Sequence, residues 1–119
     1  MQRLLSLLLV LGTAGGQYSG VKVTQTPKFL SIKPGDGAEF HCHQDNENFD
    51  FMYWYRQEPG NEPTLMMLSR SAGSVEMESP YQAEWEAERN RTTNSSLQLK
   101  GGNGGDSATY LCATSLHSH

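Results

Sequence analysis

The chain has 119 residues, with 13 acidic and nine basic side chains and a formal net charge of −4. This length fits one domain and is too short for a two-domain enzyme. The sequence contains no basic cluster, which argues against nucleic-acid binding because that function normally needs a basic stripe. The 12 glycines and the frequent Ser, Thr and Asn residues are typical of an all-β domain with many turns.

The N-terminus has the features of a secretory signal peptide. Arg3 supplies a positive charge, residues 4–11 form an apolar run, and the small residues 13–16 that follow form a cleavage neighbourhood. This run is too short to cross a bilayer, which requires about 20 apolar residues. We therefore predict a signal peptide over residues 1–16, with cleavage as late as Gly20 left open.

The two cysteines of the predicted mature domain, residues 17–119, are candidates for a disulfide. Secretion places the chain in an oxidising compartment, where a cysteine pair normally forms a bridge. Cys42 and Cys112 lie 112 − 42 = 70 residues apart. On the chain-entropy account, closing so long a loop stabilises the fold by about 4 kcal/mol.

Two glycosylation sequons fit the same compartment. They are Asn90-Arg91-Thr92 and Asn94-Ser95-Ser96. Both lie in a polar stretch without apolar alternation, and we therefore expect Asn90 and Asn94 on a surface turn.

Alternation of apolar and polar side chains predicts a series of strands along the mature chain. The clearest segments are residues 38–44, 52–57 and 81–88, followed by shorter ones near 97–99 and 108–112. The residues predicted to face inward are Ala38, Phe40, Cys42, Met52, Trp54, Ala83, Trp85, Ala87, Tyr110 and Cys112. Clusters of Gly, Pro, Asn and Asp separate these segments. Short strands with turns between them predict a two-sheet sandwich.

Four of these residues form a characteristic set. Trp54 follows Cys42 by 12 residues, and Tyr110 precedes Cys112 by two. Both cysteines have inward parity, so a bridge between the two sheets is geometrically natural, with Trp54 placed to pack on it. Tyr110 occupies the position of a tyrosine corner.

With these residues, the chain resembles an immunoglobulin variable-type domain, most closely a T-cell receptor β variable segment. Residues 23–27 (VTQTP), 52–60 (MYWYRQEPG) and 106–112 (DSATYLC) are similar to that family's motifs, and 112–115 (CATS) resembles the start of its third loop. Arg56 favours the receptor over antibody light chains. The resemblance implies an all-β, V-type two-sheet Greek-key sandwich.

Three features depart from the family pattern. The chain ends at His119, before any F-G-x-G joining segment, so the resemblance implies a germline-like segment whose last strand is missing. The glycine-rich residues 101–105 replace the usual turn before Asp106. The family pairs the Asp106 equivalent with an arginine near the start of the strand that holds Trp85. In this chain three alternatives stay open: Asp106 pairs with Arg89, it pairs with Arg91, or it has no partner.

The resemblance implies one surface that packs against a T-cell receptor α variable domain. The matching residues are Tyr55, Gln57, Pro63, Leu65 and Leu111, with Gln57 exchanging hydrogen bonds with a partner glutamine. Parity directs Tyr55, Gln57 and Leu111 away from the core. The alternative, that Tyr55 and Leu65 complete the domain's own core, is left open.

The resemblance also implies a second surface, the loop end, which binds a peptide–MHC complex. Its loops would be residues 44–51, 69–75 and 113–119. The expected antigen contacts are Asn46, Glu47, Asn48, Phe49, Asp50, Arg70, Ser71, Thr114 and Ser115. We expect Phe49 to be exposed as an aromatic contact, whereas Phe51 could face either way. A constant region outside this chain would supply the membrane anchor and reach the signalling subunits.

Enzyme and metal readings find little support in the sequence. His41 and His43 share a strand face, but no H-x-E or C-x-x-C frame accompanies them. Glu84, Glu86 and Glu88 are predicted to form a solvated acidic face. No nucleophile–base pair stands out, so we predict no catalytic site, metal or cofactor. The alternative function is a non-rearranging V-set adhesion or inhibitory receptor domain.

Overall fold

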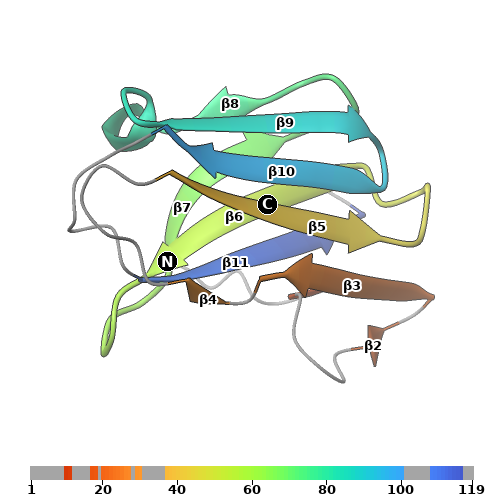
Figure 1. Cartoon of the computed structure of the whole chain (residues 1–119). Coiled ribbons are helices and arrows are strands. Elements are labelled where there is room, and N and C mark those ends of the chain that lie inside the picture. The colour runs from red at the N-terminus through yellow and green to blue at the C-terminus, as the bar shows by residue number, and fades with distance from the viewer. Residues whose placement is uncertain are drawn as a thin grey trace.

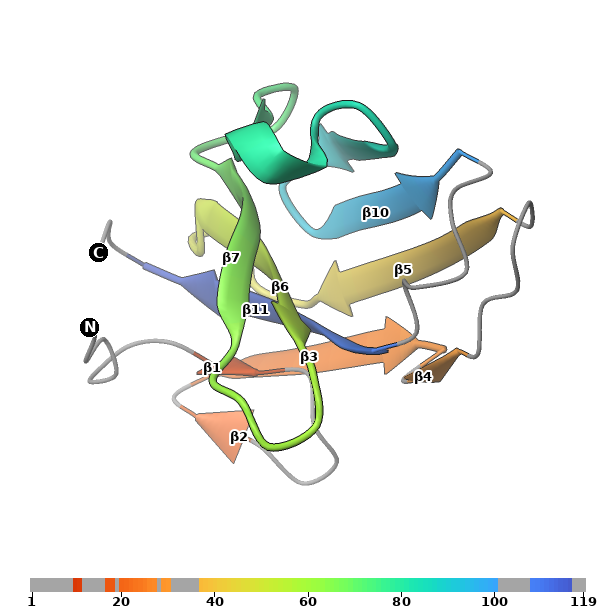
Figure 2. The same cartoon turned by 90° about the vertical axis from the view of Figure 1, so that its left-hand side faces the viewer.

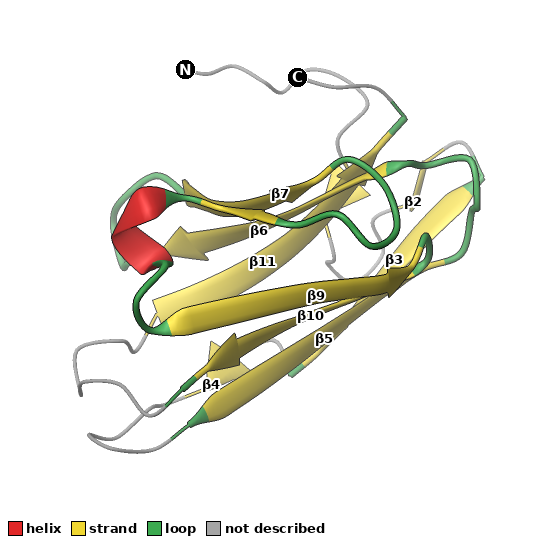
Figure 3. Cartoon of the chain, turned by 90° about the horizontal axis from the view of Figure 1, so that it is seen from above, coloured by secondary structure: helices red, strands yellow, loops and turns green. Residues whose placement is uncertain are grey.

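The computed structural model describes residues 10–11, 17–18, 20–27, 29–30, 37–100 and 108–116. These residues form two antiparallel sheets packed face to face, as Figures 1 and 3 show. The first sheet contains, in order, β1 (Val10–Leu11), β11 (Ala108–Ser115), β6 (Phe51–Gln57), β7 (Thr64–Ser69) and β8 (Glu76–Met77), with β4 (Phe29–Leu30) also on β11. The second contains β2 (Gln17–Tyr18), β3 (Val21–Thr26), β5 (Ala38–Gln44), β10 (Asn94–Leu99) and β9 (Trp85–Arg91). The predicted all-β sandwich is confirmed.

The predicted disulfide is also confirmed, and it joins the two sheets. Cys42 of β5 and Cys112 of β11 are bridged, with their Cα atoms 6.3 Å apart. Trp54 and Tyr110 are fully buried beside the bridge. The ring of Phe40 lies 4.8 Å from that of Tyr110 and 6.3 Å from that of Trp54, centroid to centroid. Tilted aromatic pairs at these distances add to the stabilisation that burial itself provides.

A buried hydrogen bond ties the aromatic core to the second sheet. Nε1 of Trp54, on β6, donates to Oγ of Ser95 on β10 at 3.0 Å. The same hydroxyl donates to the carbonyl of Glu88 on β9. The indole nitrogen therefore has the partner that a buried donor requires.

The strand predicted over residues 81–88 was placed too early. Ser79–Tyr81 form a short 3₁₀ turn that contains Pro80, and β9 begins only at Trp85. Proline fixes φ and lacks an amide donor, so the chain turns here before it can enter the sheet. Ala83 is consequently exposed instead of facing inward. The strand then continues to Arg91, which brings Arg89 into the interior.

The prediction of a surface turn around both sequons needs a similar correction. Asn90 lies on β9 and Asn94 on β10, on either side of the two-residue turn formed by Thr92 and Thr93. Both asparagines are exposed. They are therefore strand residues that flank a hairpin turn.

The edge of β11 carries two short strands. Val10 and Leu11 of β1 pair with Thr114 and Ala113. Figure 2 shows both short strands, β1 and β4. Farther along β11, Ala108 and Thr109 pair with β4. β1 falls inside the predicted signal peptide, whose other residues lie outside the described part, and the cleavage site stays a prediction. Among the described residues, no helix is long and apolar enough to cross a membrane.

Candidate binding surfaces

The outer face of the first sheet carries a row of three large side chains, called here the Tyr55 row. Leu111 of β11, Tyr55 of β6 and Leu65 of β7 lie opposite one another in the strand register. All three are half-buried. Because cross-strand neighbours on one face pack together, the row forms a continuous aromatic and aliphatic strip that stays accessible from outside.

A second row lies beside the first and is more deeply buried. Tyr53 of β6 lies opposite Ala113 and Leu68, and only 4% of its surface is exposed. Its hydroxyl shares a 3.0 Å hydrogen bond with Oγ of Ser115. The rings of Tyr53 and Tyr55 are 6.1 Å apart, which extends the Tyr55 row into an aromatic patch.

Burial changes the acidity of both tyrosines. It raises the pKa of Tyr55 to about 12, with a smaller contribution from the neighbouring Tyr53. It also raises the pKa of Tyr53, although the Ser115 hydrogen bond and the charge of Arg70 oppose the effect. Both phenols are therefore neutral hydrogen-bonding groups at physiological pH.

Gln57 and Pro63 lie beside the Tyr55 row, near the end of β6 and the start of β7. Gln57 is half-buried, and its Nε2 donates to the carbonyl of Asn61 at 2.9 Å. Pro63 is exposed in the segment that leads into β7. The neighbouring Arg56 instead donates from Nε to the hydroxyl of the core residue Tyr110 at 3.3 Å. All five residues predicted for the partner surface are thus at least partly accessible. Four lie in the adjacent strands β11, β6 and β7, and Pro63 lies directly before β7.

The first loop, residues 45–50 between β5 and β6, is held from beneath by Gln44. The side chain of Gln44 is fully buried. Its Oε1 accepts a hydrogen bond from the amide of Asn46 at 2.7 Å, and its Nε2 donates to the carbonyl of Phe49 at 3.2 Å. Asn46 also organises the loop, because its Oδ1 accepts from the amide of Asn48 at 2.9 Å.

The expectation that Phe49 is exposed was wrong. Its side chain is only 4% exposed and belongs to the hydrophobic core, whereas Phe51 is half-buried at the start of β6. Burying a phenylalanine ring contributes roughly 1.5–3 kcal/mol, which exceeds what a lone exposed ring would gain in the unbound chain. Asp45, Glu47, Asn48 and Asp50 are the exposed residues of this loop.

Thr114 and Ser115 were also wrongly expected to be surface contacts. Both are fully buried because β11 continues through Ser115. Oγ1 of Thr114 donates to the carbonyl of Phe51 at 2.8 Å, and Ser115 bonds to Tyr53. They support the base of the loop end, while residues 117–119 lie outside the described part of the chain.

The second loop, residues 70–75 between β7 and β8, places both of its predicted contacts in solvent. Arg70 and Ser71 are exposed, and Nε of Arg70 lies 2.8 Å from Oε2 of Glu76. Gly73 has a φ of 84°, a conformation that favours glycine. Its amide donates to the backbone carbonyl of Arg89 at 2.6 Å.

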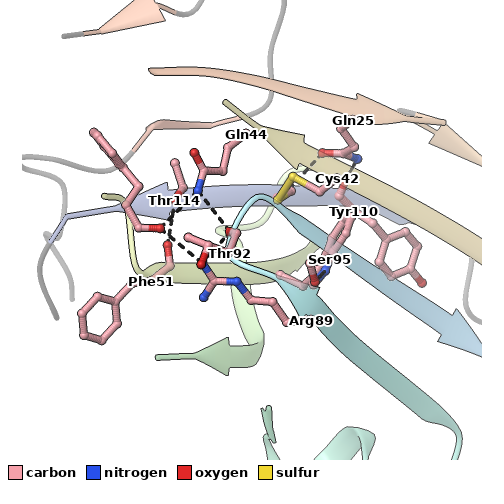
Figure 4. The surroundings of a disulfide bond; sticks show 12 residues. Gln25, Cys42, Gln44, Phe51, Arg89, Thr92, Ser95, Tyr110 and Thr114 are labelled. Carbon is pink, nitrogen blue, oxygen red and sulfur yellow. Dashed lines mark hydrogen bonds between the residues drawn. A yellow bond between two sulfur atoms is a disulfide. The ribbon is translucent and has the colours of Figure 1, made fainter. Parts of the chain in front are cut away.

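Arg89 lies at the base of the loop end, and the sequence alone does not decide whether it is the ion-pair partner of Asp106. Its side chain is 2% exposed, and it donates to the backbone carbonyls of Phe49, Asp50 and Ser69 and to the hydroxyl of Ser69. It also donates to the carbonyl of Thr92, and Figure 4 shows these two residues side by side. Burial lowers its pKa to about 10, and the charge of Asp50 partly offsets this effect. Asp106, its candidate ion-pair partner, lies outside the described residues. The alternation of β9 places Trp85 and Arg89 on the same face, so the sequence pattern itself predicts that Arg89 points inward.

The outer face of the second sheet is polar. An open hollow of about 330 Å³ is bordered by side chains of β3, β5, β9 and β10, including His41, His43, Asn90 and Asn94. His41 is exposed and lies 3.3 Å from Glu39. The part of the chain that the structure describes contains no group of three or more residues arranged to hold a metal ion.

Comparison with known proteins agrees with this geometry. Residues 25–119 match the immunoglobulin V-set domain family. The chain is 32% identical to human T cell receptor beta variable 7-4 over 91% of this chain and 93% of that protein. It is 36% identical to human T cell receptor beta variable 6-6 over 78% and 80%. It is also 32% identical to human T cell receptor alpha variable 39 over 95% and 98%.

A solved structure shows the same fold. A chain from work on T cell specificity and activation by the bacterial superantigen toxic shock syndrome toxin-1 superposes with a TM-score of 0.74 and 26% identity. The superposition covers 84% of this chain and 86% of that one. Together with the disulfide, Trp54 and the Tyr55 row, these matches show that the chain belongs to the immunoglobulin V-set family and fits its T-cell receptor β variable segments.

Proposed function

We propose that this chain is the antigen-recognition part of a T-cell receptor β chain. Once joined to a following segment and paired with an α-chain variable domain, it recognises peptide antigen presented by histocompatibility molecules. The single observation that carries the proposal is the half-buried Tyr55 row on a sheet face outside the core. The V-set family consists of non-enzymatic receptor domains, and the relatives include both β and α variable segments.

The Tyr55 row has the chemistry of an interface centre. Stable protein interfaces combine aromatic and aliphatic contact area with a few satisfied polar groups. Leu111, Tyr55 and Leu65 provide the apolar area, and Gln57 provides an amide at its margin. The α-chain variable domain is the partner we propose for this surface.

The exposed side chains of the first two loops supply the proposed antigen contacts. Glu47, Asn48 and Asp50 come from the first loop, and Arg70 and Ser71 from the second. Polar groups on a supported loop suit adaptable hydrogen bonding to a protein surface. Asn46 is partly buried and serves mainly to shape the first loop.

We propose an extracellular location on the plasma membrane, with a constant region supplying the anchor and the link to signalling subunits. We also propose N-linked glycans on Asn90 and Asn94. Both side chains are exposed beside the polar hollow of the second sheet. The Tyr55 row lies on the opposite sheet, so glycans at these positions leave the proposed pairing surface accessible.

Pairing with an α-chain variable domain is the property that tests the proposed function. We would extend the chain with a joining segment that carries the F-G-x-G motif, co-secrete it with T-cell receptor α variable domains, and measure complex formation by analytical ultracentrifugation. A Leu65→Glu substitution places a charge at the β7 end of the Tyr55 row, next to Tyr55, and should weaken pairing at least about tenfold, because desolvating an unpaired charge at an interface is costly. The matched control is Thr24→Glu, at an exposed position on the second sheet.

The expected result is a heterodimer for the wild type and for Thr24→Glu, and a much weaker one for Leu65→Glu. Equal pairing by the Leu65→Glu chain would contradict the assignment of this face. Failure of the wild type to pair with any α variable domain would contradict the proposed function itself.

A further inference from the structure

Gln44 and Arg89 form one buried polar cluster beneath the loop end. They come from β5 and β9, which are separated by β10 in the second sheet. Nε2 of Gln44 donates to the carbonyls of Phe49 and Thr92, at 3.2 and 3.1 Å. Nη2 of Arg89 donates to the same two carbonyls, at 3.2 and 2.7 Å, and Figure 4 shows both side chains reaching toward Thr92. Each carbonyl is therefore held by two side chains.

Arg89 extends this cluster to the second loop. Its Nη1 donates to the carbonyl and the hydroxyl of Ser69, at 3.3 and 3.1 Å. That hydroxyl in turn donates to the carbonyl of Ser71 at 2.9 Å. The backbone carbonyl of Arg89 accepts from the amide of Gly73 at 2.6 Å. One residue thus contacts the first loop, the second loop and the β9–β10 turn.

An arginine at this buried position carries an energetic cost. Burying a charge without an ionic partner is unfavourable, and no carboxylate of the described residues bonds to the guanidinium. Nε of Arg89 is also buried without a hydrogen-bond partner in the described part of the chain. The planar fork of five donors is what arginine alone supplies.

We propose that Arg89, assisted by Gln44, is a positioning residue that holds the first and second loops in one joint arrangement. A disturbance at the base of either loop then reaches the other loop through the guanidinium. The role of this coupling in antigen recognition rests on the proposed function. The coupling itself is a property of the unbound chain, and it can be tested without any ligand.

Hydrogen–deuterium exchange with residue-level resolution measures this coupling directly. The informative variant is Ser69→Ala, which removes the hydroxyl that links Arg89 to Ser71 at the second loop. Arg89→Lys keeps the charge but provides only three donors on a flexible stem. The control is Arg91→Lys, at an exposed position on the same strand. Because local openings and global unfolding expose different sets of amides, exchange separates loop effects from loss of the fold.

For Ser69→Ala, we expect exchange to rise about tenfold at Gly73 and Ser74, as loss of a buried hydrogen bond implies. We expect a rise of similar size at Asn48 and Phe49 in the first loop. Core amides such as that of Cys112 should change less than about twofold, and Arg91→Lys should change none of these amides. Arg89→Lys should accelerate exchange in both loops.

Acceleration confined to the second loop in Ser69→Ala would overturn the proposal, as would a uniform rise across the core. The Ser69→Ala result stands even if Arg89→Lys does not fold. Neither outcome depends on α-chain pairing, so a failure here is distinguishable from a failure of the proposed function.

Discussion

The side chain of Gln25 hydrogen-bonds to the backbone of Cys112 and so joins the two sheets next to the disulfide. Its Oε1 accepts from the amide of Cys112 at 2.9 Å, and its Nε2 donates to the carbonyl of Tyr110. Gln25 belongs to β3 of the second sheet, whereas Cys112 belongs to β11 of the first. The amide thus satisfies two backbone groups of β11 that the short strands β1 and β4 do not pair.

Replacing Gln25 with alanine should destabilise the domain. The change leaves a buried amide and a buried carbonyl without these partners, and each such group costs about 1–3 kcal/mol. Urea unfolding, followed by tryptophan fluorescence, measures the difference. The control is Thr24→Ala, at the exposed neighbouring position, which should change the free energy of unfolding by less than about 0.5 kcal/mol. Equal stability of the two variants would show that water replaces the glutamine amide.

The disulfide should be essential to stable folding. It closes a loop of 70 residues, which corresponds to about 4 kcal/mol on the chain-entropy account. Small domains have only about 5–15 kcal/mol in total, so Cys112→Ser should abolish a cooperative unfolding transition. Circular dichroism during thermal unfolding provides the measurement, with His41→Ala as an exposed control. A soluble Cys112→Ser chain with a transition near that of the wild type would contradict this account.

Much of the sandwich could be predicted because a strand places alternate side chains on opposite faces. The inward parity of Phe40, Cys42 and Trp54 follows from that geometry alone, and all three are buried. The start of β9 could not be predicted in this way. Residues 81–88 alternate as a strand does, but the turn around Pro80 dominates locally.

Tyr55 should make the stability of the domain depend on alkaline pH. Burial raises its pKa from 10.0 to about 12. The folded state therefore holds the phenol proton more tightly than the unfolded state, and this contribution to stability is complete below pH 10. It is lost as the pH rises from 10 toward 12.

The comparison of wild type with Tyr55→Phe isolates this contribution. Tyr53 is present in both chains, so the effect of its own burial contributes to both pH profiles. Urea unfolding across this pH range should show a smaller loss of stability in Tyr55→Phe. Parallel pH profiles for the two chains would mean that the phenol of Tyr55 is as well solvated in the folded as in the unfolded state.

Glycans should be present on the chain when mammalian cells secrete it. Asn90 and Asn94 are both exposed on the outer side of the second sheet, so an attached sugar displaces no core residue. Intact mass before and after peptide-N-glycosidase treatment of Asn90→Gln and Asn94→Gln assigns each position. The double variant provides the glycan-free control. An unmodified mass for the wild type would refute the glycan proposal.

The details of the loop end depend on contacts between residues far apart in the chain. Phe49 lies in a polar stretch without periodicity, so only the space available in the core decides whether its ring turns inward. Arg89 donates a hydrogen bond to the carbonyl of Phe49, which lies 40 residues earlier in the sequence. The burial of Thr114 and Ser115 depends on how far β11 continues, and β11 pairs with β6 as far as Ser115. The alternation of β9 predicts that Arg89 faces inward, but no local pattern encodes its contact with Phe49 or the point at which β11 ends.

Transcript sequencing from T cells tests the central claim, that this chain is a T-cell receptor β variable segment, most directly. The account predicts transcripts in which the codons for Cys112 to Ser115 continue, with variable junctions, into a joining segment that encodes F-G-x-G and then a constant region. A single invariant junction to an ordinary exon that encodes a complete last strand would contradict it. That result would instead favour a non-rearranging V-set adhesion or inhibitory receptor.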